Sequence, residues 1–153
     1  MANDLRIDHV AVAVRSVDEA ADRLCELLGY DRITAKVANT RQQVNVLFLG
    51  KRGSLSLKLI EPAGDRSPLW QFVKKGGGLH HIAFKSAAVE TAIDDLATRG
   101  ARLIAGPEPG EAFDDHLIAF LYLGFGLNIE VIDTDLRRGL LVPTDDAATR
   151  RSE

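Results

Sequence analysis

Two histidines and one glutamate in this chain offer the side chains that a divalent metal site requires. His9, His81 and Glu130 each lie in a short run rich in apolar residues. Two imidazoles and one carboxylate can bind a divalent metal on one face and leave other positions open for water or substrate. A neutral imidazole and an ionised carboxylate need no unusual pKa to act as ligands at neutral pH. An isolated histidine is more often a satisfied structural side chain, so the interpretation depends on spacing.

The spacing of these residues reveals an internal repeat. Residues 9–12, HVAV, are matched by residues 81–84, HIAF, at an offset of 72 positions. Lys58 in LSLKLI and Glu130 in LNIEVI are separated by the same offset. A repeat of this length indicates two similar supersecondary units that bury a shared face and leave a cleft between them.

Side-chain alternation places Lys58 and Glu130 on the cleft side of their strands. Leu57 and Leu59 flank Lys58, and Ile129 flanks Glu130 on the equivalent strand. Successive side chains of a strand point to opposite faces, and the leucine-rich face is the one that should meet a helix. We therefore expect Lys58 and Glu130 to meet the two histidines at the centre of the cleft.

The elements that carry these residues follow from apolar periodicity and from cap residues. A capping box at Ser16 starts the first long helix and Gly29 ends it, and Ser67 with Pro68 starts a short one. The predicted strands are 6–14, 31–37, 42–49, 54–61, 78–84, 101–105, 116–123 and 127–132, and the second long helix is 87–99.

This order predicts an α+β fold made of two βαβββ modules. The first module is residues 5–61 and the second is residues 77–133, joined by a helix over 67–75. Together they form one domain over residues 1–133. The tail, residues 134–153, has no sustained period, and we expect it to be mobile or to dock on the surface.

Composition excludes several classes of function. The chain has 153 residues, of which 46% are hydrophobic and 27% charged, with a net charge of −3. The sequence has no block of Lys or Arg, which argues against nucleic acid, and no apolar run approaching the roughly 18 residues of a membrane helix. Cys25 is the only cysteine, which precludes an intrachain disulfide. With no signal peptide, we expect a cytoplasmic protein.

The stretches IDHVAVAV, LHHIAF and EPAGDRSPLWQFVKKGGGLHHIAF resemble the vicinal oxygen chelate superfamily, which includes glyoxalases, bleomycin resistance proteins and dioxygenases. Its methylmalonyl-CoA epimerases are the most similar, over about residues 5–133. The resemblance implies paired βαβββ modules with His9, His81 and Glu130 as ligands of a divalent metal (Co, Mn, Ni, Zn or Fe). It also implies an epimerase or isomerase that acts on an acyl-CoA or a related 1,3-dicarbonyl through an enolate. Related proteins often dimerise, so we expect a homodimer.

Two departures from the family pattern bear on function. Lys58 stands where the family has a Gln or Glu ligand, and an ammonium has only donors. We expect Lys58 to act with Glu130 in catalysis, as a cation near the enolate oxygen. The segment PGEAFDDHLIAFLYLGFGLNIE also departs from the family pattern, which puts the substrate in question. Predicted pocket residues are Gln43, Asn45, His116 and Asn128; candidates for the general base, by position alone, are Glu111, Asp114, Asp115 and His116.

Two other functions are consistent with the same residues. In a metal-free small-molecule binding or resistance protein, Lys58 would pair with Glu130 in place of the metal. In an Fe(II) dioxygenase, the two histidines and Glu130 would hold iron. His80 neighbours His81 but is predicted to face the other way, in a structural or supporting role.

Overall fold

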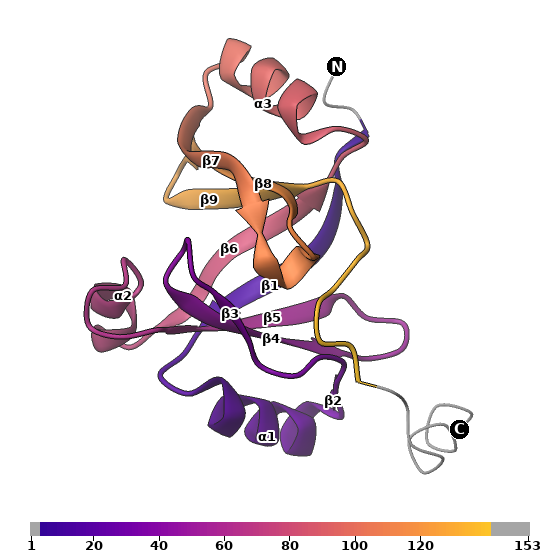
Figure 1. Ribbon diagram of the computed structural model, residues 1–153, viewed down its shortest axis with the longest axis vertical. Coiled ribbons are helices and arrows are strands. Elements are labelled where there is room, and N and C mark those ends of the chain that lie inside the picture. The colour runs from indigo at the N-terminus through magenta and orange to yellow at the C-terminus, as the bar shows by residue number, and fades with distance from the viewer. Residues whose placement is uncertain (1–3, 142–153) are drawn as a thin grey trace.

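One twisted sheet runs through the chain, and a helix lies beyond each end of it (Figure 1). The computed structural model describes residues 4–141. Within them, nine strands form a single sheet in the order β2-β4-β5-β1-β6-β9-β8-β7, with β3 paired to β4. The strands are β1 (Arg6–Ala13), β2 (Asp31–Arg32), β3 (Val37–Asn39), β4 (Val44–Gly50), β5 (Ser56–Pro62), β6 (Gly78–Lys85), β7 (Arg102–Gly110), β8 (His116–Gly124) and β9 (Leu127–Ile132). The helices are α1 (Val17–Leu28), α2 (Trp70–Lys74), α3 (Val89–Thr98) and the short 3₁₀ helix η2 (Glu111–Phe113).

The strand pairing repeats in the two halves of the chain. β1 pairs with β5 in parallel, and β6 pairs with β9 in parallel. β4 pairs with β5 antiparallel, as β8 does with β9. The two halves join where β1 and β6 run antiparallel at the middle of the sheet. This α+β architecture agrees with the predicted fold, and we propose that residues 5–61 and 77–133 are its two modules.

Helix α1 has the caps that the sequence predicts. The Ser16 hydroxyl accepts a hydrogen bond from the Glu19 N–H at 3.2 Å, which satisfies one of the helix's free amides. Gly29 ends the helix in the left-handed conformation, with φ of 71°, which costs glycine little.

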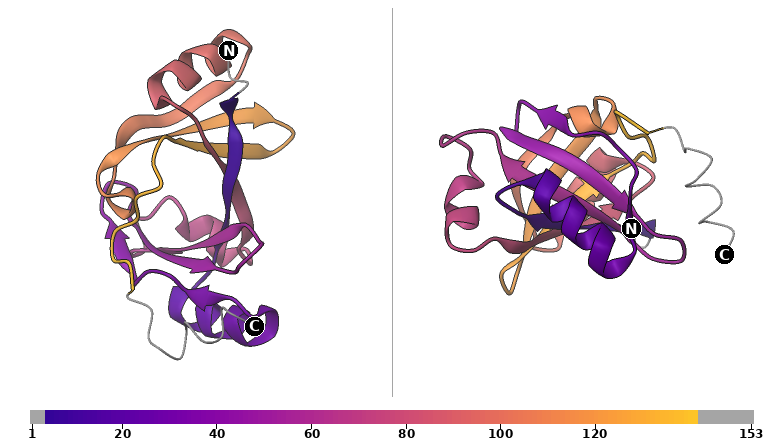
Figure 2. Two further views of the ribbon diagram at one scale, coloured as in Figure 1. Left: turned by 90° about the vertical axis from the view of Figure 1, so that its right-hand side faces the viewer. Right: turned by 90° about the horizontal axis from the view of Figure 1, so that it is seen from below.

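Helices α1 and α3 cover the outer faces of the curled sheet, and the inner faces lie between these two helices (Figure 2). Val17 and Ala21 of α1 pack on Leu59, and Val89 of α3 packs on Ile129. A third core cluster joins residues of β4, β5, β8 and β9 and includes Val46, Phe48, Ile60, Ile118 and Ile132. The face that carries Lys58 and Glu130 therefore points inward, as alternation predicts, because the adjacent leucines and isoleucine pack against the helices.

Several boundaries differ from the prediction. The linking helix covers Trp70–Lys74 instead of 67–75, because Ser67 Oγ accepts the Leu69 N–H at 3.2 Å in a turn that precedes the helix. The predicted strand 31–37 is divided into β2 and β3, and between them Ile33 and Ala35 form backbone hydrogen bonds with Leu141 and Gly139. β7 continues well beyond residue 105, to Gly110.

The segment after Asp133 docks on the surface as far as it is described. The Ala35 N–H donates to Gly139 O at 2.8 Å, and the Leu141 N–H donates to Ile33 O at 3.0 Å. This segment starts from the C-terminal half and ends against the N-terminal half, so it ties the two halves together. The rest of the predicted tail, residues 142–153, lies outside the described residues. Within residues 4–141, no helix is both long and apolar enough to cross a membrane.

Candidate metal centre and adjoining cavity

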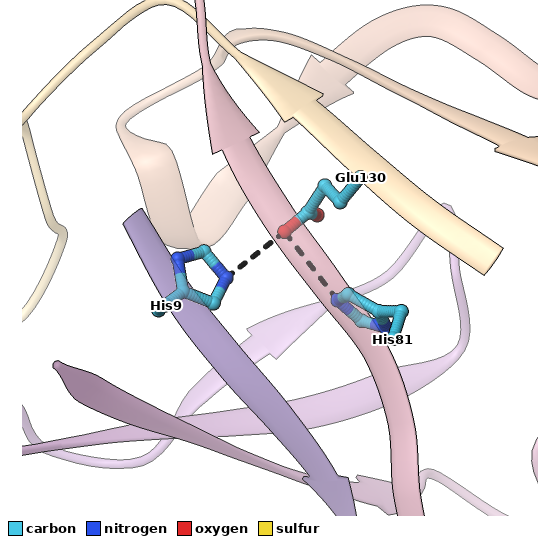
Figure 3. Close-up of side chains that lie close together, drawn as sticks. All are labelled: His9, His81 and Glu130. Atoms are coloured by element: carbon cyan, nitrogen blue, oxygen red, sulfur yellow. Dashed lines mark hydrogen bonds and ion pairs between the residues drawn. The ribbon is translucent and has the colours of Figure 1, made fainter. Parts of the chain in front are cut away.

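His9, His81 and Glu130 come together from three neighbouring strands, β1, β6 and β9 (Figure 3). One ligand atom from each lies within 4.8 Å of the other two. Glu130 Oε1 is 3.1 Å from His9 Nε2 and 3.5 Å from His81 Nε2. All three side chains are buried. The structure therefore brings together the three residues that the repeat singled out.

Neighbouring groups orient the two imidazoles. His9 Nδ1 lies 2.7 Å from the Asp8 carboxylate, and Arg137 donates to the same Asp8 oxygen at 2.7 Å. His81 Nδ1 lies 2.8 Å from His80 Nδ1. Histidines that bind metals commonly have their second ring nitrogen held by a carboxylate or another hydrogen-bonding group.

The ring nitrogens that face Glu130 are suited to bind a cation. A neutral imidazole has one N–H, so His9 cannot donate to both Asp8 and Glu130. If the N–H is on Nδ1 and donates to Asp8, the lone pair of His9 Nε2 faces the Glu130 carboxylate. His81 Nε2 is buried and has no hydrogen-bond partner within residues 4–141. Two lone pairs and a carboxylate that converge in this way fit a divalent metal with three protein ligands.

Lys58 supplies a positive charge at the same carboxylate. Its Nζ donates to Glu130 Oε2 at 3.0 Å and to Oε1 at 3.2 Å, and it lies 5.0 Å from the centre of the Phe113 ring. The Lys58 side chain is 3% exposed and that of Glu130 is 0% exposed, so the pair is shielded from water. Lys58 thus occupies one side of the site and would compete with a metal for Glu130.

Electrostatics set the charge states that a metal site needs. Burial by itself would raise the pKa of Glu130, but Lys58 and the two imidazoles hold that pKa well below its usual range. Burial lowers the pKa of His81 to about 4, against the opposing effect of Glu130. Burial also lowers the pKa of His80, with a smaller contribution from Lys58. At neutral pH, Glu130 is therefore ionised and His81 is neutral.

A cavity of about 340 Å³ adjoins this cluster. Lys58, His81 and Asn128 line it, whereas His9 and Glu130 are not among its lining residues. Its apolar walls include Val44, Ile60, Ile104 and Phe120. A bound molecule in this cavity would meet the Lys58 ammonium and the imidazole of His81 among apolar side chains.

Three predicted pocket residues lie elsewhere. Asn45 donates to Glu61 at 3.0 Å, and Glu61 accepts the Val17 N–H, so Asn45 supports the start of α1. Gln43 is exposed, and its backbone is in the left-handed conformation, with φ of 55°. This conformation interrupts the alternation of side chains expected for a strand, and Gln42 lines the cavity instead. His116 is 45% exposed, with Nδ1 3.8 Å from the carboxylate of Asp133.

His80 faces the cavity, contrary to the prediction. The β1–β6 register passes from Ala11 opposite His81 to Val12 opposite Leu79, which leaves His80 unpaired in a bulge. A bulge breaks the strict alternation of side chains. The His80 ring therefore packs against His81 and Phe72, at ring-centre distances of 5.1 Å in both cases.

The carboxylates named as base candidates by position have other partners. Glu111 accepts from the Thr40 N–H at 2.8 Å and from its hydroxyl. Asp114 and Asp115 both accept from Arg138, at 3.2 Å and 2.8 Å. None of the three lines the cavity.

Sequence reasoning missed Arg41, Gln42 and Glu108, which all line the cavity. Gln42 Nε2 donates to Glu108 Oε1 at 2.9 Å. The sequence feature that could have identified Glu108 is the run Gly-Pro-Glu-Pro-Gly at residues 106–110. Glycine and proline inside a strand indicate a bulge, and a bulge redirects the side chains near it.

Comparisons with known proteins agree with this architecture. A family model described as the glyoxalase/bleomycin resistance protein/dioxygenase superfamily matches residues 8–120. The uncharacterized protein YqjC of Bacillus subtilis is 37% identical over 100 residues, which cover 65% of this chain and 70% of that protein. An ethylmalonyl-CoA/methylmalonyl-CoA epimerase of Cereibacter sphaeroides is 30% identical over 119 residues, which cover 76% of this chain and 87% of that protein.

A solved structure of a methylmalonyl-CoA epimerase in complex with methylmalonyl-CoA and NH4+ superposes with a TM-score of 0.74 at 26% identity. The match covers 86% of this chain and 96% of the other. The family model spans residues 8–120, which is most of the chain and includes His9 and His81. This chain belongs to the glyoxalase/bleomycin resistance protein/dioxygenase superfamily.

Proposed function

We propose that this chain is an epimerase-like isomerase that acts on an acyl-CoA such as methylmalonyl-CoA, or on a related 1,3-dicarbonyl, through an enolate. The observation that carries the proposal is the buried His9–His81–Glu130 cluster, which together with Lys58 adjoins a cavity of about 340 Å³. The epimerases among its relatives and structural neighbours support the same reaction class.

The chain's own residues can stabilise negative charge where an enolate forms. Lys58 lines the cavity and is held by both oxygens of Glu130, so its position is set before a substrate arrives. Charged donors that are fixed in advance at a developing oxyanion lower the barrier, because they need little reorganisation. Asn128 adds an amide to the same cavity, whose walls include the apolar side chains of Val44, Ile60 and Phe120.

A divalent metal held by His9, His81 and Glu130 would supply Lewis-acid polarisation of the substrate carbonyls. The Lys58 ammonium belongs to the same class of cation as the NH4+ found with methylmalonyl-CoA in the solved epimerase. We therefore propose catalytic roles for Lys58 and Glu130, with Glu130 also a metal ligand.

The size of the cavity favours a short acyl group. Small-molecule pockets commonly measure roughly 300–1,000 Å³, and this cavity lies near the lower limit. The acyl group and its thioester would fill it, and the rest of the coenzyme would extend outward. Arg41 is exposed and lines the cavity, so its positive charge is available to an anionic substrate.

Hydrogen exchange in D2O tests the proposal directly. Methylmalonyl-CoA is incubated with the protein, and loss of the C2 proton signal is followed by NMR. Metal content is measured in parallel on protein purified without a chelator. We expect exchange well above the uncatalysed rate, reduced after metal removal. No exchange with methylmalonyl-CoA or ethylmalonyl-CoA, with or without added Co²⁺ or Mn²⁺, would refute the function.

The Lys58–Glu130 ion pair favours one alternative, a metal-free binding protein. At 3.0 Å the pair compensates the Glu130 charge without any metal. Such a protein would bind acyl-CoA or another small molecule, contain no stoichiometric metal and show no exchange. The predicted homodimer is also part of the proposal and is tested by sedimentation velocity; the cytoplasmic location stays a prediction.

A further inference from the structure

Glu108 is the one carboxylate among the described residues that line the cavity. We propose that Glu108 is the general base that removes the acidic proton of the substrate, and that Gln42 positions it. This inference rests on the proposed function, because only an enolate-forming reaction needs such a base. It assigns the proton transfer to a residue of β7, in the C-terminal half of the chain.

The backbone of β7 is shaped to present this residue. Ala105 pairs with Phe120 and Glu108 pairs with Ile118, so two residues of β7 face one residue of β8. A bulge of this kind re-aims the side chains that follow it. Gly106 is essential to it, because a Cβ atom there would lie 2.5 Å from Ile118 O.

A hydrogen bond between the two halves of the chain holds the Glu108 carboxylate. Gln42, in the turn before β4, donates from Nε2 to Glu108 Oε1 at 2.9 Å. The donor is a neutral amide, and it engages Oε1, so Oε2 is left to accept a proton. The other amide atom, Gln42 Oε1, is buried and has no partner within the described residues. Buried polar atoms are rarely left unpaired, so this one indicates a place that a ligand N–H completes.

The other possible proton acceptors that line the cavity, His80 and His81, belong to the buried cluster or contact it, and His81 Nε2 is the atom that a metal would take. Lys58 donates to both oxygens of Glu130. His80 and His81 contact one another through their Nδ1 atoms. Glu108 is therefore the proton acceptor that lines the cavity without belonging to the His9–His81–Glu130 cluster.

The proposed step balances as a proton transfer. The Glu108 carboxylate forms an O–H bond as the C–H bond next to the thioester breaks. The C–H electron pair becomes the new C=C bond, and the carbonyl π pair moves to the oxygen, where Lys58 faces the cavity. A proton from solvent water then adds to the opposite face of the enolate, and Glu108 releases its proton to water.

Isotope exchange with matched variants tests the assignment. Glu108→Gln keeps the shape of the side chain but cannot accept the proton, so the exchange rate should fall about a hundredfold or more. Glu108→Asp should recover part of the rate, because the carboxylate remains. Gln42→Ala should lower kcat more than it changes KM. Glu90→Gln, the same change on the exposed face of α3, should have no effect.

Thermal melts of each variant separate loss of the base from loss of the fold. Folded Glu108→Gln protein with at least a third of the wild-type exchange rate would overturn the assignment and leave the proposed function standing. Failure of Glu108→Asp to exceed Glu108→Gln in rate, with both proteins folded, would also overturn it. Wild-type protein that exchanges neither methylmalonyl-CoA nor ethylmalonyl-CoA would overturn the function and this inference together.

Discussion

Replacement of Lys58 by glutamine removes a buried positive charge and supplies an amide oxygen beside Glu130. In the wild-type protein, Lys58 Nζ lies 3.0 Å from Glu130 Oε2. At an effective dielectric constant of about 20, two unit charges at this distance attract one another by roughly 5 kcal/mol. Loss of one partner from a buried pair costs about 3–5 kcal/mol, because the other charge is left uncompensated.

Without metal, Lys58→Gln should therefore lower the melting temperature by roughly 10 °C or more. The matched control is Lys36→Gln. Lys36 Nζ lies 3.1 Å from the Asp18 carboxylate, but the two side chains are 43% and 50% exposed. An exposed pair contributes at most about 1 kcal/mol, so this control should melt within a few degrees of wild type.

Metal binding gives the second measurement on the same variants. If Lys58 competes with a metal for Glu130, Lys58→Gln should tighten Co²⁺ or Mn²⁺ binding at least tenfold, or about 1.4 kcal/mol. Saturating metal should also restore much of the lost stability, because it replaces the missing charge. Equal melting temperatures for the Lys58 and Lys36 variants, with unchanged metal affinity, would show that Lys58 and Glu130 do not form a buried pair.

Three further predictions concern the same site. Glu130→Ala should abolish stoichiometric metal binding, because two neutral imidazoles compensate a dication poorly; full metal content in the folded variant would contradict this. Arg137→Met removes the guanidinium that contacts Asp8 at 2.7 Å and should weaken Co²⁺ binding about 10–100-fold in titrations; an unchanged affinity would show that this contact does not orient His9. The pKa of His81 is about 4 in the folded protein and about 6.5 in the unfolded chain. The contribution of neutral His81 to the free energy of unfolding is therefore complete above pH 6.5 and is lost as the pH falls toward 4. Urea denaturation of chelator-treated protein should show a loss of about 2 kcal/mol between pH 7 and pH 5; His81→Phe should reduce it, and an identical loss in that variant would rule out His81 as its source.

Local patterns in the sequence predicted the elements and the central cluster. Strand alternation depends on the backbone alone, so Lys58 and Glu130 could be assigned to the inner face from their flanking residues. The Ser16 cap depends on contacts within one turn and was visible in the same way. The 72-residue repeat then related His9 to His81, because both histidines open the same short apolar pattern. These features are short in range or recur at a fixed offset, so a single sequence is enough to detect them.

The tertiary structure decided which residues surround that cluster. A bulge turns His80 inward, and a second bulge turns Glu108 toward the cavity. Each bulge inserts an extra residue that shifts the alternation of side chains, and only the pairing of the strands shows where that residue lies. Arg137 reaches Asp8 across 129 positions, since the segment after β9 returns to the N-terminal half. Asn45 was assigned to the pocket by alternation but bonds to Glu61, beside α1. Register shifts and docking between distant segments are set by packing across the whole sheet, and no local pattern in the sequence carries that information.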